Sequence, residues 1–210
     1  MDASIYQVAD ADKLISPVLL YYKDFIIKNI ERAITIAGSP ERLWPHVKTH
    51  KTRELIQLLI AHGVTRFKCA TIAEAEVVAA CTPSNIILAY PLVGPNISRF
   101  LDLQNVFQNV RFWSIGDDLE QLKRLGETAV ANGSKVHLMV DVNVGQNRTG
   151  VTPDKLVAFY EAAAAIDGLE PDGLHWYEAN IHQSDFEERT QLAADSIETI
   201  FSLRDELLSK

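Results

Sequence analysis

The chain has 210 residues, 47% hydrophobic and 23% charged, with a formal net charge of −8. This balance fits one globular domain with a sizeable core, and the acidic excess disfavours a nucleic-acid partner. The longest apolar runs, such as 85–91, are far shorter than the ~20 residues that cross a bilayer. No basic segment followed by an apolar stretch marks a secretory signal, so a cytoplasmic protein without membrane contact is expected.

One pattern recurs along the chain, a short apolar strand followed by an amphipathic helix. An N-terminal strand is predicted at 17–22 and a helix at 25–37. The later strands are predicted at 43–48, 65–70, 85–91, 110–115, 135–143 and 173–181. The helices between and after them are predicted at 52–62, 72–80, 97–104, 118–131, 153–165 and 185–208.

This alternation predicts parallel, right-handed βαβ units, arranged either as an open sheet or as a TIM-type (β/α)8 barrel. A dinucleotide-binding open sheet would carry a Gly-x-Gly-x-x-Gly turn after its first strand, whereas this turn reads Lys48-Thr49-His50-Lys51. The barrel is therefore favoured. It takes eight units and about 250 residues, and about six units follow the N-terminal pair here. We expect an incomplete barrel with uncovered strand edges, either part of a longer protein or completed by a partner.

The reacting groups of such barrels lie at the C-terminal ends of the strands. Polar residues at the predicted ends are His46, Lys48, Lys68, Tyr90, Ser114, Asp117, Asp141, Asn143, Arg148, Tyr177, Asn180 and His182. Strand alternation would direct His46 and Lys48 into the barrel mouth. Desolvation of a lysine favours the neutral amine that attacks aldehydes, although a lysine snorkelling beside a helix start is equally compatible with the position.

Arg148 lies between Gly145 and Gly150 in a loop just past a predicted strand, where it could meet a ligand ring or an anion. The alternative is an ion pair with Asp141 or Asp117. Tyr177 can hydrogen-bond a ring nitrogen, and His182 can move protons near neutral pH. His137 and His175 are expected to be structural. Cys69 and Cys81 match no zinc motif and are expected to be small buried residues.

The same residues, in this order, resemble the fold-type III pyridoxal-phosphate (PLP) enzymes of the D-threonine aldolase and D-serine dehydratase branch, whose barrel is of the alanine racemase N-terminal type. The matching segments are 45–52, 67–76, 88–95, 141–151 and 177–182, and the resemblance spans about residues 17–185. The sequence departs from the family at Trp44, where arginine is usual, and at Ala179-Asn180, where Gly-His is frequent.

The resemblance implies a PLP-dependent lyase acting on D-3-hydroxy amino acids. Lys48 would form the Schiff base with pyridoxal 5'-phosphate, and His46, Arg148 and Tyr177 would also contact the cofactor. His182 becomes a candidate acid/base. The family further implies a homodimer and a divalent zinc or manganese ion, whose ligands would lie outside this chain.

On this view residues 1–210 are an incomplete PLP-binding α/β barrel domain. The remaining barrel units, the phosphate-binding loops and a C-terminal β-domain would lie elsewhere, and the fragment alone would be inactive. Three alternatives stay open: a PLP-dependent amino-acid racemase that takes its second base from beyond Lys210, a non-catalytic PLP-binding barrel, and a degenerate barrel kept as an assembly subunit.

Overall fold

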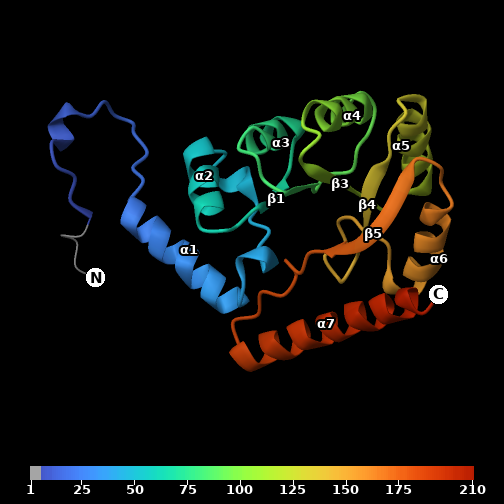
Figure 1. The fold of residues 1–210 in the computed structure, drawn as a ribbon. Helices are drawn as coiled ribbons and strands as arrows, with labels where there is room; N and C mark the ends of the chain where they lie inside the picture. The colour runs from blue at the N-terminus through green and yellow to red at the C-terminus, as the bar shows by residue number, and fades with distance from the viewer. Residues whose placement is uncertain (1–5) are drawn as a thin grey trace.

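A parallel five-stranded sheet forms the centre of the computed structural model, which describes residues 6–210 (Figure 1). Its strands lie side by side in chain order, each hydrogen-bonded to the next. They are β1 (Arg66–Cys69), β2 (Asn85–Leu88), β3 (Arg111–Gly116), β4 (Val136–Val142) and β5 (Leu169–Trp176). Sequential parallel strands joined by helices are the βαβ arrangement that the sequence predicts.

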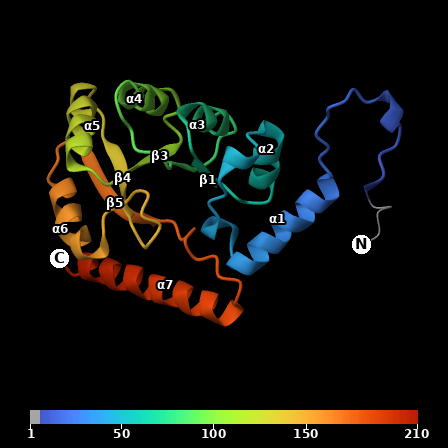
Figure 2. The same cartoon turned by 180° about the vertical axis from the view of Figure 1, so that it is seen from behind.

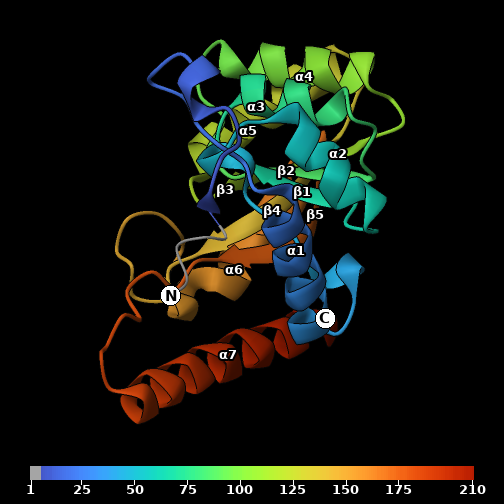
Figure 3. The same ribbon diagram turned by 90° about the vertical axis from the view of Figure 1, so that its left-hand side faces the viewer.

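Seven α-helices accompany the sheet within the described residues. They are α1 (Lys23–Ala37), α2 (Arg53–Ala61), α3 (Ile72–Ala79), α4 (Asn96–Val106), α5 (Leu119–Ala131), α6 (Pro153–Ala164) and α7 (Phe186–Leu208). All seven helices were predicted from the sequence, and the structure confirms them with small shifts at their ends. Helices α2 to α6 form an arc along one side of the sheet (Figures 1 and 2). The long α7 runs beside α6, where its Ile200 is buried (Figure 3).

The main core lies between the sheet and this arc of helices. Side chains on the outer face of the strands, such as Phe67, Ile86 and Phe112, are fully buried against the helices. Phe100 of α4 meets Phe112 edge-on, with ring centroids 6.1 Å apart. Cys69 and Cys81 are free and buried, and burial raises the pKa of both thiols. Both cysteines are therefore small core residues, as expected.

The inner face of the sheet carries a smaller apolar group centred on Ile87, Trp113 and Ile115. Trp44 packs edge-on against Trp113, with ring centroids 5.8 Å apart. Strands β1 and β5 are the edges of this sheet, because each pairs with only one neighbouring strand among residues 6–210. The arrangement is that of a partial barrel, with the two uncovered edges that the strand count predicts.

Two predicted strands are not strands in the structure. Residues 17–22 have no regular structure, because no described neighbour offers them a ladder of hydrogen bonds. The segment 43–48 keeps one parallel bridge, between His46 and Lys68, and then turns into a 3-10 helix, Val47–Thr49. Pro45 lacks an N–H for a ladder, and the imidazole of His46 accepts the N–H of Lys48. Both features favour a turn over an extended strand.

The last strand lies earlier than predicted, at Leu169–Trp176 instead of 173–181. A register shift between Leu138 and Met139 of β4 leaves Asp172 without a direct partner, as in a β-bulge. After Trp176 the chain turns, and the N–H of Ile181 donates to the carbonyl of Glu178. Tyr177 and the residues up to His182 therefore lie in a loop beyond the sheet.

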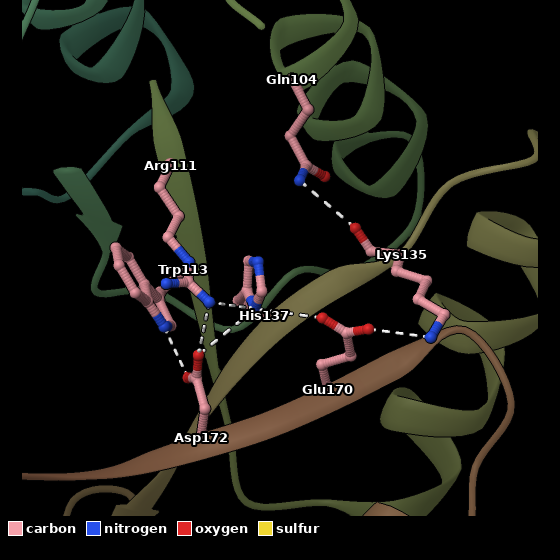
Figure 4. Close-up of polar contacts among 7 residues, drawn as sticks. All are labelled: Gln104, Arg111, Trp113, Lys135, His137, Glu170 and Asp172. Atoms are coloured by element: carbon pink, nitrogen blue, oxygen red, sulfur yellow. Dashed lines mark hydrogen bonds and ion pairs between the residues drawn. The ribbon is translucent and has the colours of Figure 1, made fainter. Parts of the chain in front are cut away.

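The shifted register turns Asp172 toward a polar network at the N-terminal ends of β3 to β5 (Figure 4). Trp113 Nε1 donates to Asp172 at 2.5 Å, and Arg111 lies 3.4 Å from the same carboxylate. The network continues through His137 and Glu170 to Lys135, whose carbonyl accepts from Gln104. This network satisfies polar groups at one end of the sheet. The opposite end carries Lys68 and Asp141.

No helix of the described residues has the length and hydropathy needed to cross a membrane.

Candidate active site

A cavity of about 560 Å³ lies at the C-terminal ends of the strands. Its volume is within the ~300–1,000 Å³ range of small-molecule and cofactor sites. It lies where the reacting groups of βα barrels are found. Its lining residues are His46, Lys48, Lys68, Ala70, Ala89, Tyr90, Pro91, Val93, Ile115, Asp141, Arg148, Thr149, His175 and Tyr177.

Lys48 reaches this cavity from the 3-10 turn that follows Pro45. The carbonyl of Val47 accepts the N–H groups of His50 and Lys51, at 3.1 and 2.8 Å. Lys51 closes the turn with a positive φ of 51°. Although this segment is a turn and not the predicted strand, it brings His46 and Lys48 to the same cavity. Of the two interpretations of Lys48, burial is not seen among the described residues, where the lysine is exposed.

The buried carboxylate of Glu74 links this turn to the start of α3. One Glu74 oxygen accepts the N–H of Ala70 at 2.8 Å, and the other lies 3.4 Å from Lys51 Nζ. Thr71 caps the same helix by accepting the N–H of Glu74. Glu74 thus satisfies the helix start and holds the lysine-bearing turn against it.

His46 is neutral at physiological pH. Burial, together with the positive charges of Lys48 and Lys68, lowers the pKa of His46 to about 4. The neutral ring accepts the backbone N–H of Lys48 through Nδ1, at 3.4 Å. His46 therefore contributes a hydrogen-bonding group to the cavity without adding a positive charge.

The Arg148 loop is closed at its base by a bridge between Val142 and Val151. Inside the loop, Oδ1 of Asn143 accepts two backbone N–H groups, and Asp117 accepts the N–H of Gly150 at 2.6 Å. Gly150 has a φ of 102°, and a Cβ placed there would lie 2.5 Å from the backbone N of Asn143. Only glycine fits this position without strain, so the loop geometry depends on it.

Arg148 projects over the ring of Tyr177, with the guanidinium carbon 5.3 Å from the ring centroid. Among residues 6–210 no carboxylate lies within ion-pair distance of Arg148. Asp141 pairs with His175 instead, and Asp117 holds the loop backbone. Arg148 therefore lines the cavity without the ion pair of the alternative, and its contact with a ligand stays a prediction.

Lys68, His175 and Asp141 form a hydrogen-bonded chain in the cavity wall. Lys68 Nζ lies 2.5 Å from His175 Nε2, and His175 Nδ1 lies 2.6 Å from Asp141 Oδ1. Asp141 and His175 are almost fully buried. Burial lowers the pKa of Lys68; Asp141 opposes this change, whereas Lys48 and Arg148 add to it.

Four predicted site residues, His46, Lys48, Arg148 and Tyr177, line this one cavity. The predicted acid/base His182 is exposed in the loop after β5 and is not among the lining residues. Its role stays a prediction.

His175 lines the cavity, although a structural role was expected of it. The signal that could have found it is its i, i+2 spacing from Tyr177, because alternate residues of an extended segment share a face. His137 does have the structural role expected of it, in the network of Figure 4.

No group of three or more metal-ligating side chains is found among the described residues. The divalent metal that the resemblance implies therefore has no counterpart in this part of the chain.

The chain belongs to the family described as alanine racemase, N-terminal domain, whose model matches residues 23–207. The match covers the sheet and helices α1 to α6 completely, together with nearly all of α7. The fold is therefore the α/β barrel type of that family, as the sequence indicates.

Individual relatives point to a narrower group. The chain is 28% identical over 152 residues to a D-threonine aldolase of an Arthrobacter species, covering 71% of this chain and 40% of the relative. It is 25% identical over 185 residues to the 3-hydroxy-D-aspartate aldolase of Paracoccus denitrificans, covering 86% of this chain and 47% of the relative. The chain thus spans less than half the length of these two relatives.

Among solved structures, the D-threonine aldolase of Filomicrobium marinum matches 91% of this chain and 53% of its own, with a TM-score of 0.80 and 31% identity. The D-threo-3-hydroxyaspartate dehydratase of Delftia sp. HT23 matches 94% of this chain and 52% of its own, with a TM-score of 0.83 and 21% identity. The second match shows similarity of fold alone.

Proposed function

We propose that this chain is the cofactor-holding part of a PLP-dependent lyase that acts on D-3-hydroxy amino acids. The observation that carries the proposal is the convergence of Lys48, Arg148 and Tyr177 on one cavity at the strand ends. The similarity to D-threonine and 3-hydroxy-D-aspartate aldolases supports the reaction class.

The cavity suits PLP in both size and chemistry. Lys48 Nζ is the amine that would hold the cofactor aldehyde, because the turn carries its exposed side chain to the cavity. Arg148 and Tyr177, already stacked on each other, would flank the ring. Neutral His46 would accept or donate a hydrogen bond beside it. When bound, PLP supplies an electron sink, and the protein selects which substrate bond breaks.

The charge of the cavity fits an anionic ligand. Lys48 and Arg148 line it as cations, and the one carboxylate among the lining residues, Asp141, is already paired with His175. A phosphorylated cofactor and an amino-acid carboxylate both carry negative charge, so both would be attracted to this cavity.

A product assay on the full-length protein tests the proposal. With PLP and D-threonine, or with D-threo-3-hydroxyaspartate, we expect either glycine and an aldehyde or a keto acid and ammonia. Lys48→Ala should remove this turnover, whereas Lys28→Ala, an exposed lysine on α1, should not. Formation of the epimer alone would identify a racemase, and PLP binding without turnover would identify a non-catalytic barrel. Either result would contradict the lyase.

A further inference from the structure

The cavity holds a second lysine that the proposed function does not use. Lys68 lies near the end of β1, half-buried, whereas Lys48 lies exposed on the turn before α2. A half-buried lysine loses much of the hydration that stabilises its charge, so it needs polar partners. The partners of Lys68 are His175 and, through it, Asp141.

The geometry of this chain fixes the direction of its hydrogen bonds. A carboxylate only accepts, so the 2.6 Å contact with Asp141 places the proton of His175 on Nδ1. Nε2 of His175 is then the atom that accepts from Lys68 Nζ, 2.5 Å away. This contact holds the Lys68 amine in a defined position in the cavity wall.

We propose that Lys68 is a second proton-transfer residue of the cavity, with His175 and Asp141 as the residues that position it. This inference rests on the proposed lyase function and deepens it. Asp141 fixes the tautomer of His175, and His175 accepts a hydrogen bond from Lys68. Partial burial and the neighbouring charges of Lys48 and Arg148 favour the neutral amine that a base requires.

In the proposed reaction, Lys68 Nζ takes the proton of the substrate β-hydroxyl. The electron pair of the broken O–H bond forms the aldehyde carbonyl as the Cα–Cβ bond breaks. When bound, PLP would supply the sink for the Cα–Cβ electrons. The proton that Lys68 takes from the hydroxyl equals the proton that Cα gains in glycine, so the step would balance without an added oxidant or reductant.

Charged and titratable groups from every neighbouring element act on Lys68. His46 and Lys48 precede α2, Asp141 ends β4, and Arg148 belongs to the loop that follows. From the β5 side come His175 and Tyr177, whose ring centroid is 5.8 Å from Lys68 Nζ. The two nearby cations favour the neutral amine, and Asp141 opposes it. Replacing Asp141 should therefore make Lys68 easier to deprotonate.

The first test measures the protonation of Lys68 without any turnover. Trace labelling of amines in the cofactor-free full-length protein, followed across pH by peptide mass mapping, gives the titration midpoint of Lys68. The same peptide in the denatured protein is the reference. We expect a lower midpoint in the folded protein, with about tenfold more neutral amine for each pKa unit of the difference. Asp141→Asn should lower the midpoint further. A folded midpoint equal to the denatured one would overturn the proposal.

The second test is kinetic. Lys68→Gln should lower kcat by about a hundredfold or more, the usual contribution of a general base, while borohydride still fixes PLP on Lys48. His175→Gln should lower kcat more than it raises KM, and Asp141→Asn should move the acidic limb of the pH profile to lower pH. An unchanged kcat in Lys68→Gln would refute the proposal that Lys68 is the base. If the wild type neither binds PLP on Lys48 nor turns over, the lyase proposal fails instead, and the labelling midpoint still reports on Lys68.

Discussion

Glu74 joins the lysine-bearing turn to α3 through Lys51, whose Nζ lies 3.4 Å from Glu74 Oε1. The contact matters because the glutamate is buried and also accepts the N–H of Ala70. The position of Lys48 thus depends on the carboxylate of Glu74, which lies 26 residues later in the chain.

Replacing Glu74 should therefore loosen both the helix start and the turn. We expect Glu74→Ala to lower the free energy of unfolding by about 1–3 kcal/mol, because it leaves a buried N–H without an acceptor. Glu76→Ala, at an exposed position of the same helix, is the matched control. Urea unfolding measures both. Equal stability of the two variants would show that Glu74 stabilises neither the helix start nor the turn.

Acid should destabilise the folded protein partly through His46. The pKa of His46 in the folded protein, about 4, lies below the ordinary value of 6.5. As the pH falls, the unfolded chain therefore binds a proton at His46 before the folded protein does. The stability present above pH 6.5 is therefore lost as the pH falls toward 4. His46→Gln should reduce this loss by about 1 kcal/mol, after allowance for the partial exposure of the ring. Burial also lowers the pKa of His50, so part of the acid sensitivity should remain. An unchanged stability–pH curve in the variant would contradict the assignment.

Gly150→Ala should distort the Arg148 loop. The added Cβ would meet the backbone at 2.5 Å, at a φ that is itself unfavourable for alanine. We expect a loss of about 1–3 kcal/mol and weaker PLP binding. Gly94→Ala is the control, because Gly94 also has a positive φ but has no atom within 4 Å of an added Cβ. Denaturant unfolding and PLP titration should separate the two variants; a larger effect at Gly94 would rule out crowding as the cause.

Arg148→Ala should weaken PLP binding about tenfold while leaving the fold intact, since Arg148 contacts Tyr177 and no described carboxylate. Arg148→Lys keeps the charge but loses the planar stacking surface, so its affinity should be intermediate. PLP absorbance titration gives the affinities, and circular dichroism checks the fold. Unfolding of Arg148→Ala with PLP affinity preserved would assign the arginine a structural role.

The network in Figure 4 should stabilise the sheet without affecting the cavity. Asp172→Ala leaves the nearly buried Trp113 Nε1 without its acceptor, so we expect a stability loss of about 1–3 kcal/mol. Asp167→Ala, at an exposed position before β5, should have little effect. Thermal unfolding compares the two, and PLP fixation on Lys48 should stay as in the wild type. A loss of PLP binding in Asp172→Ala would show that the two ends of the sheet are coupled.

The sequence predicted the elements whose signals are local. Most helices have an amphipathic pattern, and β1 to β4 bury the apolar side chains of their outer face. It failed at 43–48, where Pro45 and the His46 ring replace a hydrogen-bonded ladder with a turn. It also misplaced β5, because the register shift beside Met139 depends on pairing with a distant strand.

The candidate site likewise contains residues with a local sequence signal and residues that meet only through the fold. Lys48 and Arg148 lie in segments with recognisable spacing, so the sequence located them. Lys68 and His175 are 107 residues apart, and their contact exists only because β1 and β5 curve toward one cavity. Such a contact leaves no local pattern in the sequence.

Borohydride reduction would show directly whether Lys48 holds PLP. The full-length protein would be incubated with PLP, reduced, digested and mapped by mass spectrometry, with Lys48→Ala as the control. We expect a pyridoxyl group on Lys48 in the wild type and no comparable modification of Lys51 or Lys68. A pyridoxyl group on another lysine, or none at all, would contradict it.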